Sequence, residues 1–322
     1  MHNRFAFITA VLFLGLALAS GPALADVIPL TSLDLVGTSQ ITTNASNQTV
    51  LRLTPNFDTN PAGAPPAGAA WTNTQYNVAA GFTANFQFQM SDPCIGNGQN
   101  GSCIDDHGHG GDGIAFLIQN SAQGTSAIGE GASGMGFLGI TDSVAVMLDT
   151  YQNNSPNYYG DPSNNYISVN TMGTGPNVPH HFCINGKLTA DPSVPTDQPA
   201  IPCTTNPTLG MTGFGGVPAL SSNMDSGVHD IGIVYNGSML DVYLDSALVL
   251  SVAIDLATTL NLQGGDDAYL GFTAGTRFSF QNQDILSFSE APVPEPIWSQ
   301  LWLPLAALIA VAVGRKLKRV TT

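Results

Sequence analysis

A period-two alternation of apolar and polar side chains constrains the fold of this chain more than any other feature. From Phe82 to Met90 every second residue is apolar, and threonine, asparagine and glutamine stand between them. This pattern is typical of a β-strand with one buried and one solvated face. Short apolar runs recur along the chain, without sustained helical periodicity. They lie at Gly113 to Ile118, Val144 to Leu148, Ile231 to Tyr235, Met239 to Leu244, Tyr269 to Ala274 and Ile285 to Phe288.

Glycine, asparagine and proline separate these runs. The chain has 35 glycines and 21 prolines among 322 residues, and Asn236-Gly237 between two runs is a hairpin-turn signal. Many short strands without an internal repeat indicate a sandwich. Residues 26–290 are therefore predicted to form one all-β domain, an antiparallel β-sandwich of the jelly-roll type.

The excess of acidic over basic residues limits the possible ligands. The net charge is −15, and residues 26–290 hold 22 of the 23 acidic residues but only three basic ones, Arg52, Lys187 and Arg277. Nucleic acid is excluded as a partner because its binding needs basic patches.

The N-terminal residues 1–25 are predicted to be a secretory signal peptide. Arg4 precedes an apolar run from Phe5 to Ala19, and Ala23-Leu24-Ala25 fits a cleavage site. The alternative is an uncleaved anchor helix, for which the run is short. The sequence therefore predicts export.

The C-terminal residues 291–322 form a second targeting segment. Pro294-Glu295-Pro296 precedes an apolar run from Ile297 to Val313, and a basic cluster follows from Arg315 to Arg319. The order predicts a transmembrane segment that holds the body outside the cytoplasm. It resembles the PEP-CTERM sorting signal of Gram-negative bacteria. That resemblance implies a transient inner-membrane anchor, cut by an exosortase-type enzyme, and a mature form at the cell surface or in the extracellular matrix. A permanent anchor is the alternative.

Export also affects the four cysteines, which allow three pairings. In an oxidising compartment the local scheme, Cys94 with Cys103 and Cys183 with Cys203, is the simplest expectation because each disulfide would close one loop. Their spacing is not that of a zinc cluster.

A cluster of oxygen-bearing residues follows the apolar run Val144 to Leu148. Asp149, Tyr151, Asn153 and Asp161 offer carboxylate, amide and carbonyl oxygens, the ligands that calcium prefers. Aspartate and asparagine are also common in turns for their own backbone hydrogen bonds. Calcium binding and an ordinary polar loop both remain open from composition alone.

Several motifs, in order, resemble the legume-type (L-type) lectin family over most of the body. The resemblance implies a concanavalin-like sandwich. The matching residues are Trp71 after Gly68-Ala69-Ala70, Phe82 with Phe86 and Phe88, Asp112 to Phe116, Gly134 to Phe137, Val144 to Asn153 with Asp161-Pro162, Val242 to Leu244, Gly271 to Thr276, and Asp284 to Ser289.

The resemblance also implies roles for particular residues. Calcium would be bound by the side chains of Asp149, Asn153 and Asp161 and by the carbonyl of Tyr151. The sugar would be bound by Asp112, a backbone N–H of the loop at Gly134, and the amide of Asn153, with the Tyr151 ring beside them. A cis peptide bond is expected between Gly111 and Asp112.

Two positions depart from the family's pattern. Met147 and Tyr166 stand where the family has the glutamate and histidine of a second, transition-metal site. Thioether and phenol are poor ligands for such ions, so no transition-metal site is expected. The interval between Asn153 and Asp161 is long for the family, which makes Asn154 and Asn157 alternatives to Asn153.

Other polar clusters are weaker candidates. His107 and His109 lie among aspartates and could bind zinc or nickel, but a polar loop is the simpler interpretation, as it is for His180-His181. A retaining glycosidase needs two neighbouring carboxylates, and the relevant strand reads Met147-Leu148-Asp149. We therefore expect no enzyme but a calcium-dependent carbohydrate-binding protein, with Gly275 to Gln283, including Arg277, as its specificity loop. A neutral saccharide is the better candidate for its ligand, because the acidic balance disfavours anionic exopolysaccharide unless calcium bridges it. A structural matrix protein without sugar binding is the alternative, and a glycoside hydrolase a weaker one.

Overall fold

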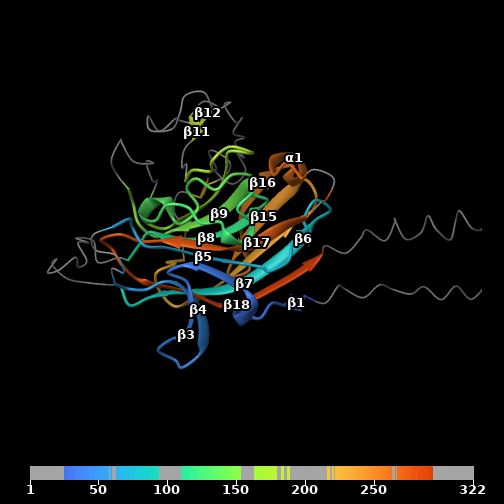
Figure 1. The fold of residues 1–322 in the computed structure, drawn as a ribbon. Coiled ribbons are helices and arrows are strands. Elements are labelled where there is room, and N and C mark those ends of the chain that lie inside the picture. The colour runs from blue at the N-terminus through green and yellow to red at the C-terminus, as the bar shows by residue number, and fades with distance from the viewer. Residues whose placement is uncertain are drawn as a thin grey trace, which may run out of the picture.

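The computed structural model gives the chain as a two-layered β-structure (Figure 1). Short helical turns are the only other regular elements in its described part. The residues that it describes are 25–57, 59, 63–93, 110–153, 163–179, 183–184, 187–188, 216–217, 220, 222–262, 265 and 267–292.

The first layer is an antiparallel sheet with β7 near its centre, called here the β7 sheet. Its strand order is β16-β15-β14-β7-β18-β4-β3, with β1 paired to β18. The strands are β1 (Asp26–Val27), β3 (Gln40–Thr43), β4 (Thr49–Thr54), β7 (Phe82–Ser91), β14 (Val228–Tyr235), β15 (Met239–Leu244), β16 (Ala247–Ala253) and β18 (Asn282–Pro292).

The second layer, the β8 sheet, is also antiparallel. Its order is β13-β10-β9-β8-β17-β5-β2, with β6 paired to β17. The strands are β2 (Asp34–Gly37), β5 (Ala67–Trp71), β6 (Tyr76–Asn77), β8 (Gly113–Gln119), β9 (Ser143–Asp149), β10 (Tyr166–Thr171), β13 (Gly216–Val217) and β17 (Asp267–Gly275). A separate pair joins β11 (Cys183–Ile184) to β12 (Lys187–Leu188).

Short helical turns connect some of the strands. They are the 3₁₀ turns η1 (Leu30–Ser32), η2 (Gly124–Ser126) and η3 (Ala132–Gly134), and one α-helical turn, α1 (Leu256–Thr259). Asp255 caps α1 by accepting a hydrogen bond from the Thr258 N–H. Among the described residues no helix is long and apolar enough to cross a membrane. The apolar run from Ile297 to Val313 lies outside them.

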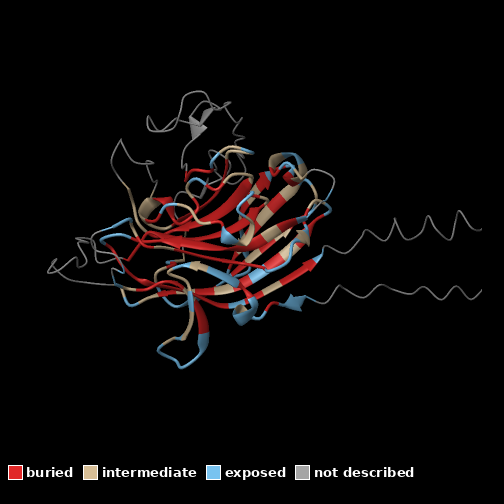
Figure 2. Ribbon diagram, in the orientation of Figure 1, coloured by how far each residue is buried: buried red, intermediate tan, exposed pale blue. Residues whose placement is uncertain are grey.

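The main core lies between the two sheets, where Figure 2 shows a continuous buried layer. Four phenylalanines meet at its centre, Phe86 and Phe288 from the β7 sheet and Phe116 and Phe272 from the β8 sheet. The Phe86 and Phe272 rings are 5.0 Å apart and the Phe272 and Phe288 rings 4.9 Å apart, both edge to face. Aromatic rings in this arrangement hold the layers together by burial and by their quadrupoles.

A second apolar cluster lies on the outer face of the β8 sheet. The segment 127–140 covers this face, with Met135 and Phe137 packed against Ala115 and Met147. Every residue of β8 and β9 is therefore buried, which explains why these strands are apolar without alternation. The outer face of the β7 sheet is open, so β7 alternates between buried and accessible side chains as the sequence predicts. The predicted all-β antiparallel sandwich is confirmed.

Candidate functional site

Asp112 lies at the entrance to β8, where three elements of the β8 sheet meet. The Gly111–Asp112 peptide bond is cis, as the sequence resemblance leads us to expect. The N–H of Asp112 donates to the Gly275 carbonyl at 2.9 Å, and the Thr150 N–H donates to the Asp112 carbonyl at 3.0 Å. The backbone of Asp112 is thus fixed between the end of β17 and the residue after β9. Its side chain is buried.

Asp149 ends β9 beside it. In the antiparallel register Asp149 is opposite Gly113 of β8 and Tyr166 of β10. Its Oδ1 accepts a hydrogen bond from the Tyr151 N–H at 2.9 Å, which turns the chain after the strand. The structure therefore brings two predicted site residues, Asp112 and Asp149, to neighbouring strands at one edge of the sheet.

Tyr151 packs directly against the peptide that precedes Asp112. A Cβ atom at Gly111 would lie 2.7 Å from the Tyr151 Cβ and 3.1 Å from its Cγ. Because real Cβ atoms do not approach so closely, a larger residue at 111 would push the tyrosine away from the site. Tyr151 and Asn153 are half-buried, between the core and solvent.

The glycine-rich loop reaches the site through Gly275. A Cβ atom at Gly275 would lie 2.6 Å from the Ala132 carbonyl and 2.9 Å from the Met135 Cα, so the loop rests on the end of β17. The same Gly275 carbonyl accepts from Asp112, which makes this residue the link between loop and carboxylate. The N–H of Gly134 donates to Gly131 at 3.0 Å and is used inside the loop.

The segment that follows β17 lies on the other side of the Asp112 site. Gln283 is fully buried, and its Nε2 donates to the carbonyls of Gly111 at 3.0 Å and Gly275 at 3.1 Å. The Gly111 N–H donates to the Ser279 carbonyl at 2.6 Å. The predicted specificity loop, 275–283, is therefore anchored to the backbone that carries Asp112.

Phe278, in this loop, is a candidate contact that the sequence analysis missed. Its side chain is exposed, and the Arg277 guanidinium lies 4.9 Å from its ring centre. Its position next to Arg277, inside the loop expected to determine specificity, is the sequence signal that could have identified it.

An ion pair anchors β18 next to Gln283. Arg52 donates from Nε and Nη2 to the two carboxylate oxygens of Asp284, each at 2.8 Å, and the Asp284 side chain is fully buried. The hydrogen bond to Asp284 raises the pKa of Arg52 above its ordinary value. The forked geometry is the strongest that a guanidinium makes with a carboxylate.

Met147 and Tyr166 are both fully buried in the cluster beneath segment 127–140. The Tyr166 hydroxyl donates to Asp149 Oδ2 at 3.0 Å. Tyr166 stands where the resemblance would place a metal-binding histidine, and its phenol instead donates a hydrogen bond to Asp149. One oxygen of Asp149 is therefore held by a neighbouring side chain.

The residues present fit a hard cation such as calcium as far as they are described. Asp149 is a buried carboxylate, Oδ1 of which accepts from the Tyr151 N–H and Oδ2 from the Tyr166 hydroxyl, and carboxylate oxygens are ligands that calcium prefers. The half-buried carbonyl of Tyr151 and amide of Asn153 add oxygens of the kind that calcium binds. No group of three histidine, cysteine, aspartate or glutamate side chains comes together within the described residues.

Several predicted residues lie outside the described part of the chain, so their predictions stay open. They are Asp161, Asn154 and Asn157, the histidines 107, 109, 180 and 181, the side chains of the four cysteines, and the sorting motif Pro294, Glu295 and Pro296.

Comparison with known proteins identifies the family. The sequence profile of the legume lectin beta-barrel domain matches residues 28–289, which is most of the chain. This chain belongs to that family. As a legume-type lectin domain, it carries Asp112, Asp149 and the glycine-rich loop within the matched region, and both sheets lie inside it apart from β1 and the last residues of β18.

Solved structures share the fold at low sequence identity. The metal-free form of lectin I-B4 from Griffonia simplicifolia is 19% identical, with a TM-score of 0.52, over 81% of this chain and 93% of that one. Peanut lectin with a 9mer peptide is 17% identical, with a TM-score of 0.51, over 86% and 100%. The lectin from Bauhinia forficata in complex with GalNAc is 16% identical, with a TM-score of 0.51, over 84% and 97%.

Proposed function

We propose that this protein is a calcium-dependent lectin that binds a neutral saccharide at Asp112. The observation that carries the proposal is the link between Asp112 and the Asp149 turn, made by the hydrogen bond from Thr150 to Asp112 and by Tyr151 against Gly111. Sugar hydroxyls are recognised by a few rigid, convergent polar groups, and this edge of the sheet gathers them.

Each residue has a distinct part in the proposal. Asp112 accepts hydrogen bonds from two adjacent sugar hydroxyls, and the amide of Asn153 adds a further polar contact. The Gly134 N–H is used inside its loop, so the backbone N–H groups of the half-buried Ala132 and Ser133 are the better donors from that loop. The Tyr151 and Phe278 rings offer apolar faces to the C–H side of the sugar.

Calcium fits the proposal through Asp149, Tyr151, Asn153 and Asp161. When bound, the ion would hold the Asn153 amide and the Tyr151 turn in one arrangement. The family member from Bauhinia forficata is complexed with GalNAc, which supports saccharide as the ligand class. The relatives are lectins, and β9 carries Asp149 as its one carboxylate, which does not favour hydrolysis of the sugar.

A glycan array with the full chain tests the function. We expect binding in calcium that is lost in excess chelator, and lost again in Asp112→Ala. The matched control is Asp142→Ala, which removes a half-buried carboxylate just before β9, at the opposite end of that strand from Asp149. Unchanged binding in chelator would contradict the calcium requirement, and unchanged binding in Asp112→Ala would place the sugar elsewhere.

A structural role without sugar binding is the second candidate. The contact from Tyr166 to Asp149 favours it, because a direct hydrogen bond could hold the turn without any ion. Isothermal titration with calcium separates the two. No calcium binding together with an empty glycan array would support the structural role.

We further propose that the chain is exported and processed at both ends. The signal at residues 1–25 and the sorting signal at 291–322 support this. Mass spectrometry of the protein from its native host should find a mature N-terminus at Asp26 and the loss of the apolar tail after Pro294-Glu295-Pro296. An intact tail in the mature protein would indicate a permanent anchor.

A further inference from the structure

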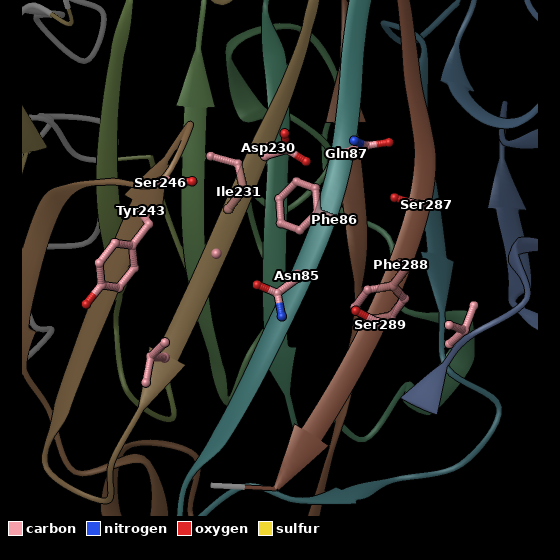
Figure 3. Close-up of a pocket in the computed structure, with 13 residues that line it drawn as sticks. Asn85, Phe86, Gln87, Asp230, Ile231, Tyr243, Ser246, Ser287, Phe288 and Ser289 are labelled. Carbon is pink, nitrogen blue, oxygen red and sulfur yellow. The ribbon is translucent and has the colours of Figure 1, made fainter. Parts of the chain in front are cut away.

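A groove crosses the outer face of the β7 sheet, on the side away from the core. It has a volume of about 610 Å³ and spans β15, β14, β7 and β18, with Val27 of β1 at one end. Figure 3 shows labelled side chains from these four neighbouring strands around it. The volume lies in the range of small-molecule sites, about 300–1,000 Å³.

Gly232 creates the hollow. In the sheet register it stands between Tyr243 of β15 and Asn85 of β7, so a residue without a side chain separates an aromatic ring from an amide. A Cβ atom at this position would lie 3.3 Å from Asn85 Oδ1 and 3.6 Å from the Tyr243 Cβ. Glycine in the middle of a strand often marks close approach of a ligand or another chain.

The groove is lined by groups that match a polyhydroxylated ligand. Two amides, two hydroxyls, one carboxylate and one phenol come from neighbouring positions of four strands. They belong to Asn85, Gln87, Ser287, Ser289, Asp230 and Tyr243. Amides and hydroxyls both donate and accept, as sugar hydroxyls do, and the tyrosine ring offers an apolar face to the C–H side of a sugar.

The charged residues of the lining narrow the class of ligand that fits the groove. Asp230 is the one ionisable carboxylate in the lining, and no lysine, arginine or histidine lines the groove. Anionic ligands are therefore disfavoured, and a single carboxylate is too little for a divalent cation. A second copy of the chain in the groove would instead give a concentration-dependent dimer, which the test below distinguishes from a saccharide.

We propose that this groove is a second saccharide site, for an uncharged oligosaccharide segment, and that it does not depend on calcium. It lies on the opposite sheet from Asp112, and none of the proposed calcium ligands lines it. One chain would then contact a polysaccharide through two faces, which raises the apparent affinity for a polymer above that of either site.

The test isolates the groove from the Asp112 site. The full chain carrying Asp112→Ala is titrated in excess chelator with neutral gluco-, manno- and galacto-oligosaccharides, and binding is followed by calorimetry. At least one of them should bind, and Gly232→Val, which fills the hollow, should weaken that binding about tenfold or more. Tyr243→Ala should weaken it as well, which protects the test against misfolding of one variant. Thr83→Val, on the same face of β7 but outside the lining, is the matched control.

Three results would overturn the proposal. They are no binding of any oligosaccharide in the Asp112→Ala chain, binding that neither Gly232→Val nor Tyr243→Ala changes, and a concentration-dependent dimer that Gly232→Val abolishes. If the unmutated chain shows groove binding but no calcium-dependent binding, only the function proposed for Asp112 is contradicted.

Discussion

The two sheets of this protein differ in what covers their outer faces. Segment 127–140 lies over the β8 sheet, so β8 and β9 are buried on both sides. The β7 sheet faces solvent, and its strands alternate between buried and accessible residues, visible as bands along the ribbon (Figure 2). The covered sheet carries the candidate calcium and sugar residues at its edge, where buried hydrogen bonds fix their backbone.

The difference shows how a sandwich can present two kinds of binding surface. At the covered edge, hydrogen bonds with Gly275 and Thr150 hold the Asp112 backbone, and Gln283 bonds the carbonyls of Gly111 and Gly275 beside it, so the site is rigid before any ligand arrives. On the open face the polar groups of the groove depend only on the position of their strands. A substitution that disrupts segment 127–140 should therefore disturb the Asp112 site and leave the groove on the β7 sheet unchanged.

The largest effect is expected from a substitution within segment 127–140, which covers the β8 sheet. Phe137→Ala removes a fully buried ring from segment 127–140 and should lower the free energy of unfolding by about 3–5 kcal/mol. Leu248→Ala on the open sheet deletes a side chain that is 44% exposed and should cost about 0.5 kcal/mol or less. Urea unfolding measures both. Similar losses for the two variants would mean that the segment does not act as a core layer.

Substitution of Arg52 tests the part of the β7 sheet that lies beside the Asp112 site. Arg52→Ala leaves the Asp284 carboxylate buried without its partner, which should cost about 3 kcal/mol in the free energy of unfolding. The double variant Arg52→Met with Asp284→Leu removes both charges and should recover most of the loss. A double variant as unstable as the single one would show that the ion pair itself, and not the unpaired carboxylate, sets the cost.

The contact between Tyr166 and Asp149 allows a finer test of the covered edge. Tyr166→Phe removes one hydroxyl that donates to a carboxylate, so the free energy of unfolding should fall by about 2 kcal/mol. Since the bond orients a proposed calcium ligand, calcium affinity should weaken about tenfold in calorimetry. Tyr269→Phe is the control, because Tyr269 packs against the same cluster from β17. Unchanged calcium affinity would show that the phenol does not position Asp149.

The contrast between the sheets could be predicted from the sequence in large part. Alternation from Phe82 to Met90 indicates one open face, and the uninterrupted apolar runs at β8 and β9 indicate two covered ones. These patterns depend on local periodicity, which a single sequence carries. The cis peptide before Asp112 came from resemblance to a family and not from any local signal.

The long-range contacts of the site could not be predicted in this way. Gln283 and Gly111 are 172 residues apart, and Arg52 and Asp284 are 232 apart, so only the strand order makes them neighbours. The groove was missed for a different reason. Gly232 was counted as part of an apolar run, although a glycine inside a strand is itself a signal of close approach.

The smallest expected effect concerns Glu290, at the place in the β7 sheet where β1 pairs with β18. Glu290 is buried there opposite Asp26, and burial, with a smaller contribution from Asp26, raises the pKa of Glu290 to about 7. Because its ordinary pKa is 4.5, the native state keeps a proton that the unfolded chain loses between about pH 4.5 and 7, so the free energy of unfolding falls as pH rises through this window. Glu290→Gln should flatten this pH dependence and raise the Tm at pH 8 by about 2–4 °C. Asp230→Asn, on the open face, should leave the wild-type slope in place, and thermal unfolding of the three proteins from pH 5 to 8 checks the difference. A wild-type Tm that does not fall between pH 5 and 7 would show that Glu290 is solvated, and that this end of the sandwich is as open as the outer face of the β7 sheet.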